Sequence, residues 1–149
     1  MGTFLNYTKT RDVKDPVRAN ATDAGIDFFI PNDYTEIILA PQEDVLIDSG
    51  IKVIVPKGYA LIFKEKSGVA VKKKLTIGAA VVDSDYRGVV HFHLFNNGTD
   101  YRTLNPGEKI IQGLVVPVML CEPLEITEEE YELNKTMRGE GGFGSTGTR

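Results

Sequence analysis

Short apolar segments separated by turn residues constrain the fold of this chain most strongly. The segments are rich in β-branched and aromatic side chains and comprise residues 28–30, 36–39, 45–47, 51–55, 59–63, 75–82, 89–95 and 110–120. Turn-forming Pro, Gly, Asn and Asp bound nearly all of them, as in Pro56-Lys57-Gly58 and Asn105-Pro106-Gly107. Many short strands with such punctuation predict an all-β sandwich or jelly roll and argue against an alternating βαβ fold.

The segment 89–95 has the period of a strand with one face on a core. Val90, Phe92 and Leu94 alternate with more polar positions that include His91 and His93, the two histidines of the chain. Because successive strand side chains point to opposite faces, we expect both histidines on the face away from the core.

Two segments have the features of short helices. Residues 67–73 could form one or two turns with Ser67 as the N-cap, and Thr127 precedes an acidic first turn at 128–130. The second segment is predicted to lie on the solvated surface.

The composition limits the size and the partners of the protein. A chain of 149 residues with 42% hydrophobic residues can form one compact core. Its formal net charge of -4 provides no basic excess for nucleic-acid phosphates, so we expect no stable nucleic-acid binding, although local cations could hold one nucleotide.

The single cysteine and the hydropathy pattern bear on the compartment. Cys121 has no partner for an intramolecular disulfide, lies in an apolar stretch and is predicted to be a buried small hydrophobe. The N-terminal residues lack an apolar signal region, and no uncharged apolar run approaches the ~20 residues of a membrane span. We therefore expect a cytoplasmic protein without membrane attachment.

The glycine-rich segment 138–147 has two interpretations. Its backbone amides could converge on an anion, Arg138 could bind a phosphate with two hydrogen bonds, and Phe143 could stack on a base. It is not a P-loop, because no lysine precedes Ser145-Thr146 and no helix can follow. The alternative is a disordered tail, which is common for glycine-rich termini.

The segment 78–88 combines a carboxylate, a phenol and a guanidinium around one predicted hairpin. Asp83 ends an apolar strand, and residues 85–88 form a turn into the next. Asp83 could be a general base that polarises water for hydrolysis of a phosphoanhydride. The alternative is an aspartate that satisfies the backbone of the turn.

Three further segments are weaker signals when each is considered alone. Lys66-Ser67-Gly68 places a cation and a hydroxyl before a possible helix N-terminus, which suits phosphate oxygens. Asp27 in segment 24–27 and Gln112 in segment 107–112 could equally be surface or turn residues.

Together and in this order, the five segments resemble the five motifs of the dUTP diphosphatase (dUTPase) family over nearly the whole chain. The motifs correspond to residues 24–27, 66–72, 78–88, 107–112 and 138–147. The resemblance implies a homotrimeric jelly-roll-like (β-clip) barrel, with a β domain at 1–137 and a flexible glycine-rich arm at 138–149 that closes over an active site. It also implies hydrolysis of dUTP to dUMP and pyrophosphate, which limits uracil incorporation into DNA and supplies dUMP for dTMP synthesis.

The resemblance also implies roles for individual residues. Asp83 would activate the water that attacks the α-phosphorus, and Tyr86 would pack under the deoxyribose. Small Gly78 and Ala79 would leave no room for a thymine methyl. The other implied substrate contacts are Val81, Val82 and His91 at the uracil, and Lys66, Ser67, Gly68, Arg138, Phe143, Gly144, Ser145 and Thr146 at the phosphates and over the base.

A magnesium ion is implied as the cofactor. The triphosphate and water would hold most of its coordination sites, because Mg²⁺ dehydrates reluctantly. Asp27 and Gln112 would act through those waters. Because the arm and the pocket belong to different subunits in this family, a monomer should be inactive.

The sequence departs from the family pattern at several positions, among them Glu65, which stands where proline is common. Lys66 stands where arginine is usual, so the charge is kept but the two-pronged hydrogen bonding is lost. Ala80 replaces a usual glycine, and His91 follows the turn, which could alter the uracil pocket slightly.

Two alternative functions stay open at the level of sequence. A dCTP deaminase shares the fold but needs a glutamate beside the pyrimidine ring. A non-catalytic nucleotide-binding interaction module would use the same fold without turnover, and its Asp83→Asn variant would retain partner binding.

Overall fold

The computed structural model describes residues 4–142 and divides the chain into two compact units, residues 1–119 and 120–149. The first unit contains every described strand, and the described part of the second contains one short helix.

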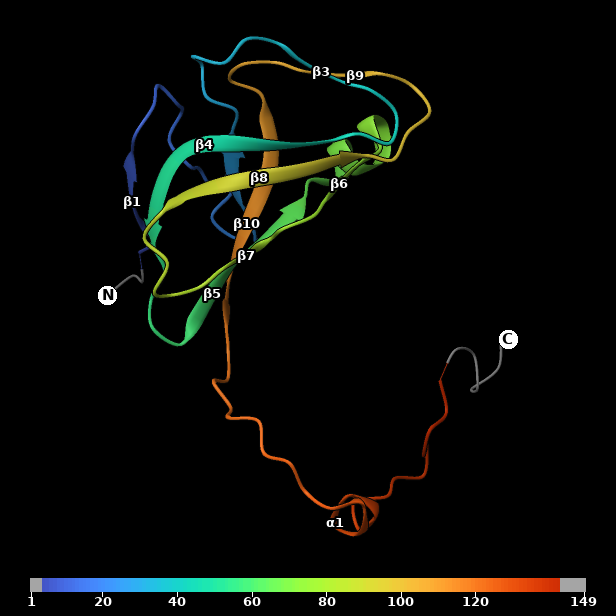
Figure 1. Cartoon of the computed structure of the whole chain (residues 1–149). Helices are drawn as coiled ribbons and strands as arrows, with labels where there is room; N and C mark the ends of the chain where they lie inside the picture. The colour runs from blue at the N-terminus through green and yellow to red at the C-terminus, as the bar shows by residue number, and fades with distance from the viewer. Residues whose placement is uncertain (1–3, 143–149) are drawn as a thin grey trace. The chain divides into compact units, whose positions relative to one another are not determined.

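Antiparallel strands form the first unit (Figure 1). The strands are β1 (Asn6–Lys9), β2 (Ile26–Phe29), β3 (Ile37–Leu39), β4 (Asp44–Ile54), β5 (Tyr59–Glu65), β6 (Leu75–Ile77), β7 (Val81–Val82), β8 (Val89–Asn96), β9 (Arg102–Leu104) and β10 (Lys109–Pro117). They build a sheet of order β1-β4-β8-β6, a sheet of order β2-β10-β5-β7 and a β3-β9 pair. The predicted all-β, jelly-roll-like fold is confirmed.

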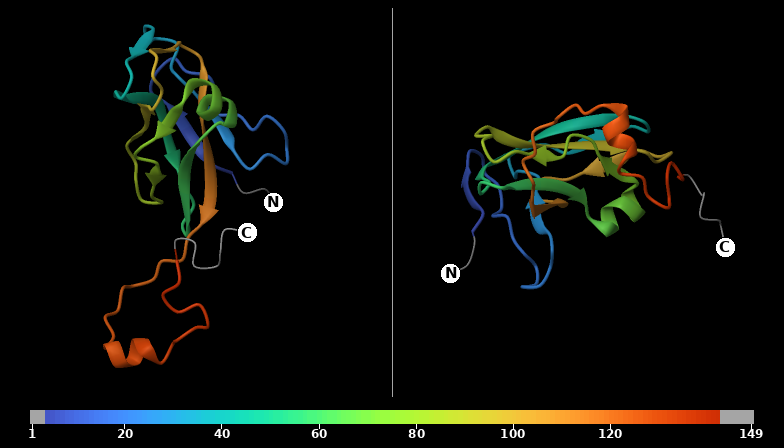
Figure 2. Two further views of the ribbon diagram at one scale, coloured as in Figure 1. Left: turned by 90° about the vertical axis from the view of Figure 1, so that its right-hand side faces the viewer. Right: turned by 90° about the horizontal axis from the view of Figure 1, so that it is seen from below.

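The strands of the first unit are arranged in layers (Figure 2), and an aromatic core joins the two four-stranded sheets. Phe92 from β8 packs edge to face against Phe63 of β5 and Phe28 of β2, with ring centroids 5.5 and 6.2 Å away. Val90 and Leu94 are also buried, whereas His91 is exposed and His93 half-buried, so the predicted alternation of β8 is confirmed. The three phenylalanines therefore fix the spacing between the sheets.

The connection from β7 to β8 is not the hairpin that the sequence predicts. β7 pairs with β5 in one sheet, whereas β8 pairs with β4 and β6 in the other. Residues 83–88 therefore carry the chain between the two sheets. The local pattern of strand, turn and strand is the same in both arrangements, and only long-range pairing distinguishes them.

The predicted helix after Ser67 differs in detail from the structure. A π-helical turn, η1 (Val69–Lys73), follows β5, and Gly68 occupies its N-cap with helical dihedral angles and no side-chain capping bond. Ser67 is itself part of the helical turn and is exposed, so the predicted Ser67 cap is wrong.

The second unit contains helix α1 (Glu128–Glu132), which begins as the sequence predicts. The Thr127 side chain accepts a hydrogen bond from Glu130 N, and the Glu130 side chain accepts one from Thr127 N. Cys121 is exposed, so its predicted burial is wrong. β10 ends at Pro117, so the apolar residues around Cys121 are not part of a sheet. Across residues 4–142 no helix is long and apolar enough to cross a membrane.

A buried amide provides a test of the fold. Asn96 is fully buried, and its Nδ2 donates to the carbonyl oxygens of Leu39, Ala40 and Asp100 at 2.9 to 3.1 Å. Asn96→Ala is expected to lower the free energy of unfolding by about 3 kcal/mol, because it leaves buried carbonyl groups unpaired. Urea unfolding measures the change.

The neighbouring Asn97 is the matched control for this variant. Asn97 is exposed, and its side chain donates one hydrogen bond, to Thr76 Oγ1 at 2.7 Å. Asn97→Ala should cost less than about 1 kcal/mol. Equal losses in the two variants would contradict the structural role of Asn96.

Candidate active site

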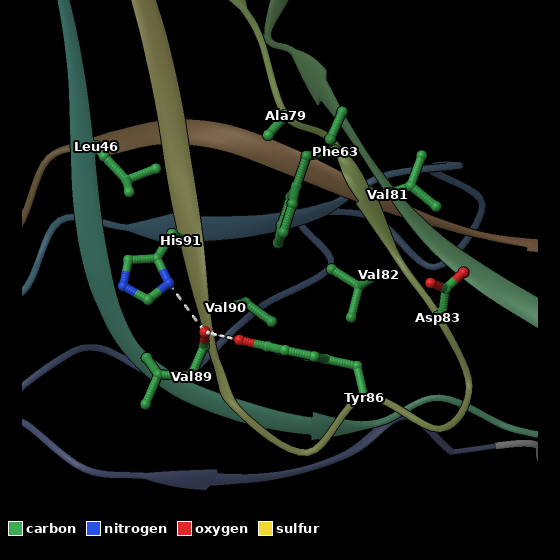
Figure 3. A pocket seen from close by; sticks show the side chains of 11 residues that line it. Leu46, Phe63, Ala79, Val81, Val82, Asp83, Tyr86, Val89, Val90 and His91 are labelled. Carbon is green, nitrogen blue, oxygen red and sulfur yellow. Dashed lines mark hydrogen bonds between the residues drawn. The ribbon is translucent and has the colours of Figure 1, made fainter.

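A pocket of about 220 Å³ lies where the chain passes between the sheets (Figure 3). Its lining comes from β4, β5 and the segment from 79 to 91: Leu46, Phe63, Ala79, Ala80, Val81, Val82, Asp83, Tyr86, Val89, Val90 and His91. Asp83 and His91 lie on opposite sides of it, and most of the wall between them is apolar. The pocket can therefore hold a flat ring next to one carboxylate.

Asp83 follows β7 directly and is exposed to solvent. Its carbonyl oxygen accepts a hydrogen bond from Tyr86 N at 3.2 Å, which closes the turn through the main chain. Among the described residues no hydrogen bond or ion pair involves the Asp83 carboxylate. The turn therefore does not need this side chain, and the carboxylate is available to water.

The Tyr86 ring is fixed across the pocket by one hydrogen bond and by a glycine. Its hydroxyl donates to Val89 O at 2.9 Å, and His91 Nδ1 lies 3.0 Å from the same oxygen (Figure 3). A Cβ on Gly88 would lie 2.2 Å from the hydroxyl oxygen. A glycine at position 88 is therefore required for this position of the ring.

The segment Gly78 to Ala80 forms one wall. Ala79 and Ala80 line the pocket, while Gly78 packs against His93 and is outside the lining. The predicted uracil contacts at Val81, Val82 and His91 all line the same pocket as Asp83 and Tyr86.

A second polar cluster surrounds the buried carboxylate of Asp27 on β2. Lys66 forms an ion pair with Asp27 Oδ1, and Lys109 Nζ lies 2.9 Å from Asp27 Oδ2. Gln112 of β10 is the register partner of Asp27 and donates from Nε2 to Glu65 O at 2.8 Å. The structure therefore brings together the predicted residues Asp27, Lys66 and Gln112.

The lysines control the ionisation of Asp27. Burial by itself would raise the pKa of this carboxyl, but hydrogen bonds from Lys66 and Lys109 outweigh burial and hold the pKa below its ordinary value. Asp27 is therefore a carboxylate at neutral pH, and the two ammonium groups form a cationic patch at the ends of β5 and β10.

The position of Gln112 also explains why the first motif has a glycine at position 25. A Cβ on Gly25 would lie 2.1 Å from Gln112 Oε1, so the glycine leaves room for the amide oxygen. Ser67 and Gly68 follow Lys66 directly in the chain and are exposed.

The two clusters do not meet within one chain. The residues of the Asp27 cluster are absent from the lining around Asp83. Phe63 lines the pocket from β5, and Lys66 follows Phe63 by three positions, which is about 10 Å along an extended chain. Arg138 belongs to the second unit, where its Nε donates to Gly141 O at 2.7 Å. Phe143, Gly144, Ser145 and Thr146 lie outside the described residues.

Sequence reasoning missed three residues of these sites. Leu46 and Phe63 line the pocket from β4 and β5, and Lys109 is the second partner of Asp27. The only local signal for Lys109 was its place as a charged residue inside the fourth motif, residues 107–112. No group of three or more His, Cys, Asp or Glu side chains suited to a metal ion occurs in residues 4–142.

The charge cluster predicts a pH-dependent stability. Because the folded-state pKa of Asp27 is lowered, the carboxylate contributes stability above the unfolded pKa of about 4, and this is lost as the pH falls through the folded value. Asp27→Asn should therefore cost about 2 kcal/mol at pH 7 and much less at pH 3, measured by urea unfolding. Asp100→Asn, at an exposed carboxylate 3.8 Å from Arg102, is the control and should change stability little at either pH. An Asp27→Asn deficit that persists undiminished at pH 3 would contradict the ion-pair interpretation.

Comparisons with known proteins agree with this geometry. A family model described as dUTPase matches residues 11–147. The deoxyuridine 5'-triphosphate nucleotidohydrolase of Corynebacterium jeikeium is 42% identical over 135 residues, which cover 89% of this chain and 84% of that protein. The enzyme of the same name from Mus musculus is 39% identical over 134 residues, covering 89% of this chain and 77% of that protein.

A solved structure is also similar over nearly the full length. The dUTPase of Staphylococcus bacteriophage 80alpha with dUPNHPP has a TM-score of 0.85 and 26% identity, and the match covers 98% of this chain and 99% of that one. The family model, the relatives and the fold agree, and the chain belongs to the dUTPase family.

Proposed function

We propose that this protein hydrolyses dUTP to dUMP and pyrophosphate by attack of water on the α-phosphorus. The observation that carries the proposal is the pocket in which an available carboxylate, Asp83, lies beside an apolar slot and the Tyr86 ring. The reaction limits uracil incorporation into DNA and supplies dUMP for dTMP synthesis.

Asp83 is the general base of the proposed mechanism. Its carboxylate accepts a proton from water as the water oxygen bonds to the α-phosphorus, and the bond to the β-phosphate bridging oxygen breaks. Pyrophosphate leaves with that oxygen. The exposure of Asp83 and the main-chain closure of its turn support this role, because the side chain is free to hold a water molecule.

The pocket wall selects the base and the sugar. The Tyr86 ring, fixed at Val89 O, packs under the deoxyribose and leaves no space for a 2′-hydroxyl. Main-chain groups between Val81 and His91 pair with the uracil edge, and unpaired polar groups penalise cytosine. Ala79 and the adjacent Gly78 hold the wall close to the base, so a thymine methyl is excluded sterically.

The Asp27 cluster binds the phosphate chain. Lys66 supplies charge, Ser67 and Gly68 contact phosphate oxygens, and Arg138 reaches the γ-phosphate. Direct ligation of Mg²⁺ by Asp27 does not suit the cluster, because both carboxylate oxygens already bind lysines. Asp27 and Gln112 fit contacts through water, with the triphosphate supplying the direct ligands. The ion, when bound, neutralises charge on the phosphates.

The active site is shared between subunits of a homotrimer. Within one chain the phosphate cluster does not line the pocket, and Lys66 follows the pocket residue Phe63 by three positions, about 10 Å along β5. A neighbouring chain therefore supplies the groups that complete each site. A β domain at 1–137 and an arm at 138–149 complete the arrangement: Phe143 stacks over the uracil, and Gly144, Ser145 and Thr146 close on phosphate.

The alternative functions find less support. A dCTP deaminase requires a glutamate beside the base, whereas Asp83 is the one carboxylate among the residues that line this pocket. Release of pyrophosphate or ammonia from dUTP and dCTP distinguishes the two reactions. A non-catalytic binding module does not account for a carboxylate that its own turn leaves free.

Removing the proposed base should abolish turnover. Asp83→Asn is expected to lower kcat for dUTP by about 10²- to 10⁴-fold, measured as pyrophosphate release with Mg²⁺, while binding of a non-hydrolysable dUTP analogue persists. Asp85→Asn is the control, because Asp85 is an exposed carboxylate two positions away and outside the pocket lining. Unchanged kcat in the Asp83 variant would overturn the assignment of the base.

Mixed trimers test the sharing of sites. A chain that ends at residue 137 lacks the arm, and Asp83→Asn lacks the base, so each alone should be nearly inactive. Refolded together at equal amounts, they should regain about a quarter of the wild-type rate per site, because a truncated subunit provides the base and the other provides the arm. If each site came from one chain, mixing would restore nothing.

A further inference from the structure

The pocket wall at residues 78–80 crosses between the two sheets. β6 pairs with β8 in one sheet and β7 pairs with β5 in the other, so the intervening residues cannot follow a single ladder. At one end Gly78 N donates to His93 O at 3.0 Å, and at the other Phe63 N donates to Ala80 O at 2.8 Å. Ala79, between these two anchors, has no strand partner of its own in either sheet.

The side chain of His93 forms a hydrogen bond with the main chain at Ala79. Ala79 N donates to His93 Nδ1 at 3.1 Å, and His93 Nε2 lies 2.9 Å from Asp44 Oδ2. A ring nitrogen that accepts a hydrogen bond carries no proton, so the neutral imidazole has its proton on Nε2 and donates it to Asp44. Asp44 therefore holds the tautomer that Ala79 requires.

Space at Gly78 and the strand register both favour this arrangement. A Cβ at Gly78 would lie 2.1 Å from His93 Nδ1, so a glycine is required if the ring is to stay in place. His93 is opposite Leu46 in the β4–β8 register, and paired residues present their side chains to the same face. Leu46 lines the pocket, so His93 lies behind the pocket wall and on its side of the sheet.

We propose that His93 is a positioning residue, oriented by Asp44, that sets how closely the main chain at Ala79 approaches the base and thereby contributes to rejection of a 5-methyl pyrimidine. This inference rests on the proposed dUTP hydrolysis for the identity of the base. It concerns neither Asp83 nor the phosphates, so the effect belongs to binding and selectivity.

Three variants separate the hydrogen bond from the packing of the ring. His93→Leu removes the acceptor for Ala79 N. His93→Asn keeps an acceptor oxygen near the Nδ1 position and is the matched control. Asp44→Ala removes the group that fixes the tautomer, and its combination with His93→Leu forms a double-mutant cycle.

Two readouts are measured on the full-length protein. Hydrogen exchange at the Ala79 amide reports its hydrogen bond independently of activity. Steady-state kinetics with dUTP and dTTP report KM, kcat and the preference between the two nucleotides. His93→Leu should expose the amide to faster exchange, raise KM for dUTP about three- to ten-fold, lower the dUTP preference by a similar factor and change kcat less.

The remaining variants give the decisive comparisons. His93→Asn should restore most of the protection and preference, and Asp44→Ala should add little to His93→Leu. Wild-type exchange and preference in His93→Leu would overturn the inference while leaving dUTP hydrolysis intact, as would an equal defect in His93→Asn. Absence of dUTP turnover in the wild type would instead refute the proposed function, and Ala79 exchange would still test the contact with His93.

Discussion

The passage of the chain from one sheet to the other over the Phe28, Phe63 and Phe92 core is the constraint on which the rest of the structure depends. Edge-to-face contacts of Phe92 in one sheet with Phe63 and Phe28 in the other, at centroid distances of 5.5 and 6.2 Å, hold the sheets apart at a fixed distance. β7 and β8 belong to different sheets, so residues 83–88 must span that distance. The turn at Asp83 is closed by its own main chain, and Gly88 leaves the space that the Tyr86 hydroxyl occupies. An available carboxylate next to an apolar slot follows from this geometry.

Local sequence patterns were sufficient to predict much of the fold. The alternation in 89–95 predicted which face of β8 is buried, and the cap at Thr127 predicted where α1 begins, because both depend on neighbours within a few residues. The pairing of β7 with β5 could not be predicted in this way, because strand partners far apart in sequence decide it. The false hairpin at Asp83 has this cause.

For the site residues, too, local patterns predicted some positions and missed those that depend on long-range packing. The motifs indicated Asp83, Tyr86 and Asp27, but not that Leu46 would line the pocket or that Lys109 would be a second partner for Asp27. Ser67 was expected to cap a helix because of its hydroxyl, yet Ser67 lies within the helical turn, and Gly68 occupies the N-cap of the π-helical segment without a side-chain capping bond. Cys121 was expected inside because its neighbours are apolar, whereas its segment follows the end of the last strand.

The two polar clusters suit different parts of the proposed reaction. The Asp27 carboxylate with Lys66 and Lys109 suits the retention of phosphate, since its charges are held in place before a ligand arrives. The Asp83 pocket, with a single free carboxylate, suits the activation of water. In the proposed trimer a second chain brings the two kinds of group together, because the residues of the Asp27 cluster do not line the Asp83 pocket within one chain.

The most direct test of this account is a crystal structure of the protein with dUpNHpp and Mg²⁺. We expect the uracil between Ala79 and Val90, the Tyr86 ring under the sugar, and the Asp83 carboxylate within hydrogen-bond reach of a water molecule in line with the α-phosphorus. The account would be contradicted if the nucleotide occupied another part of the molecule, or if Asp83 were remote from the triphosphate.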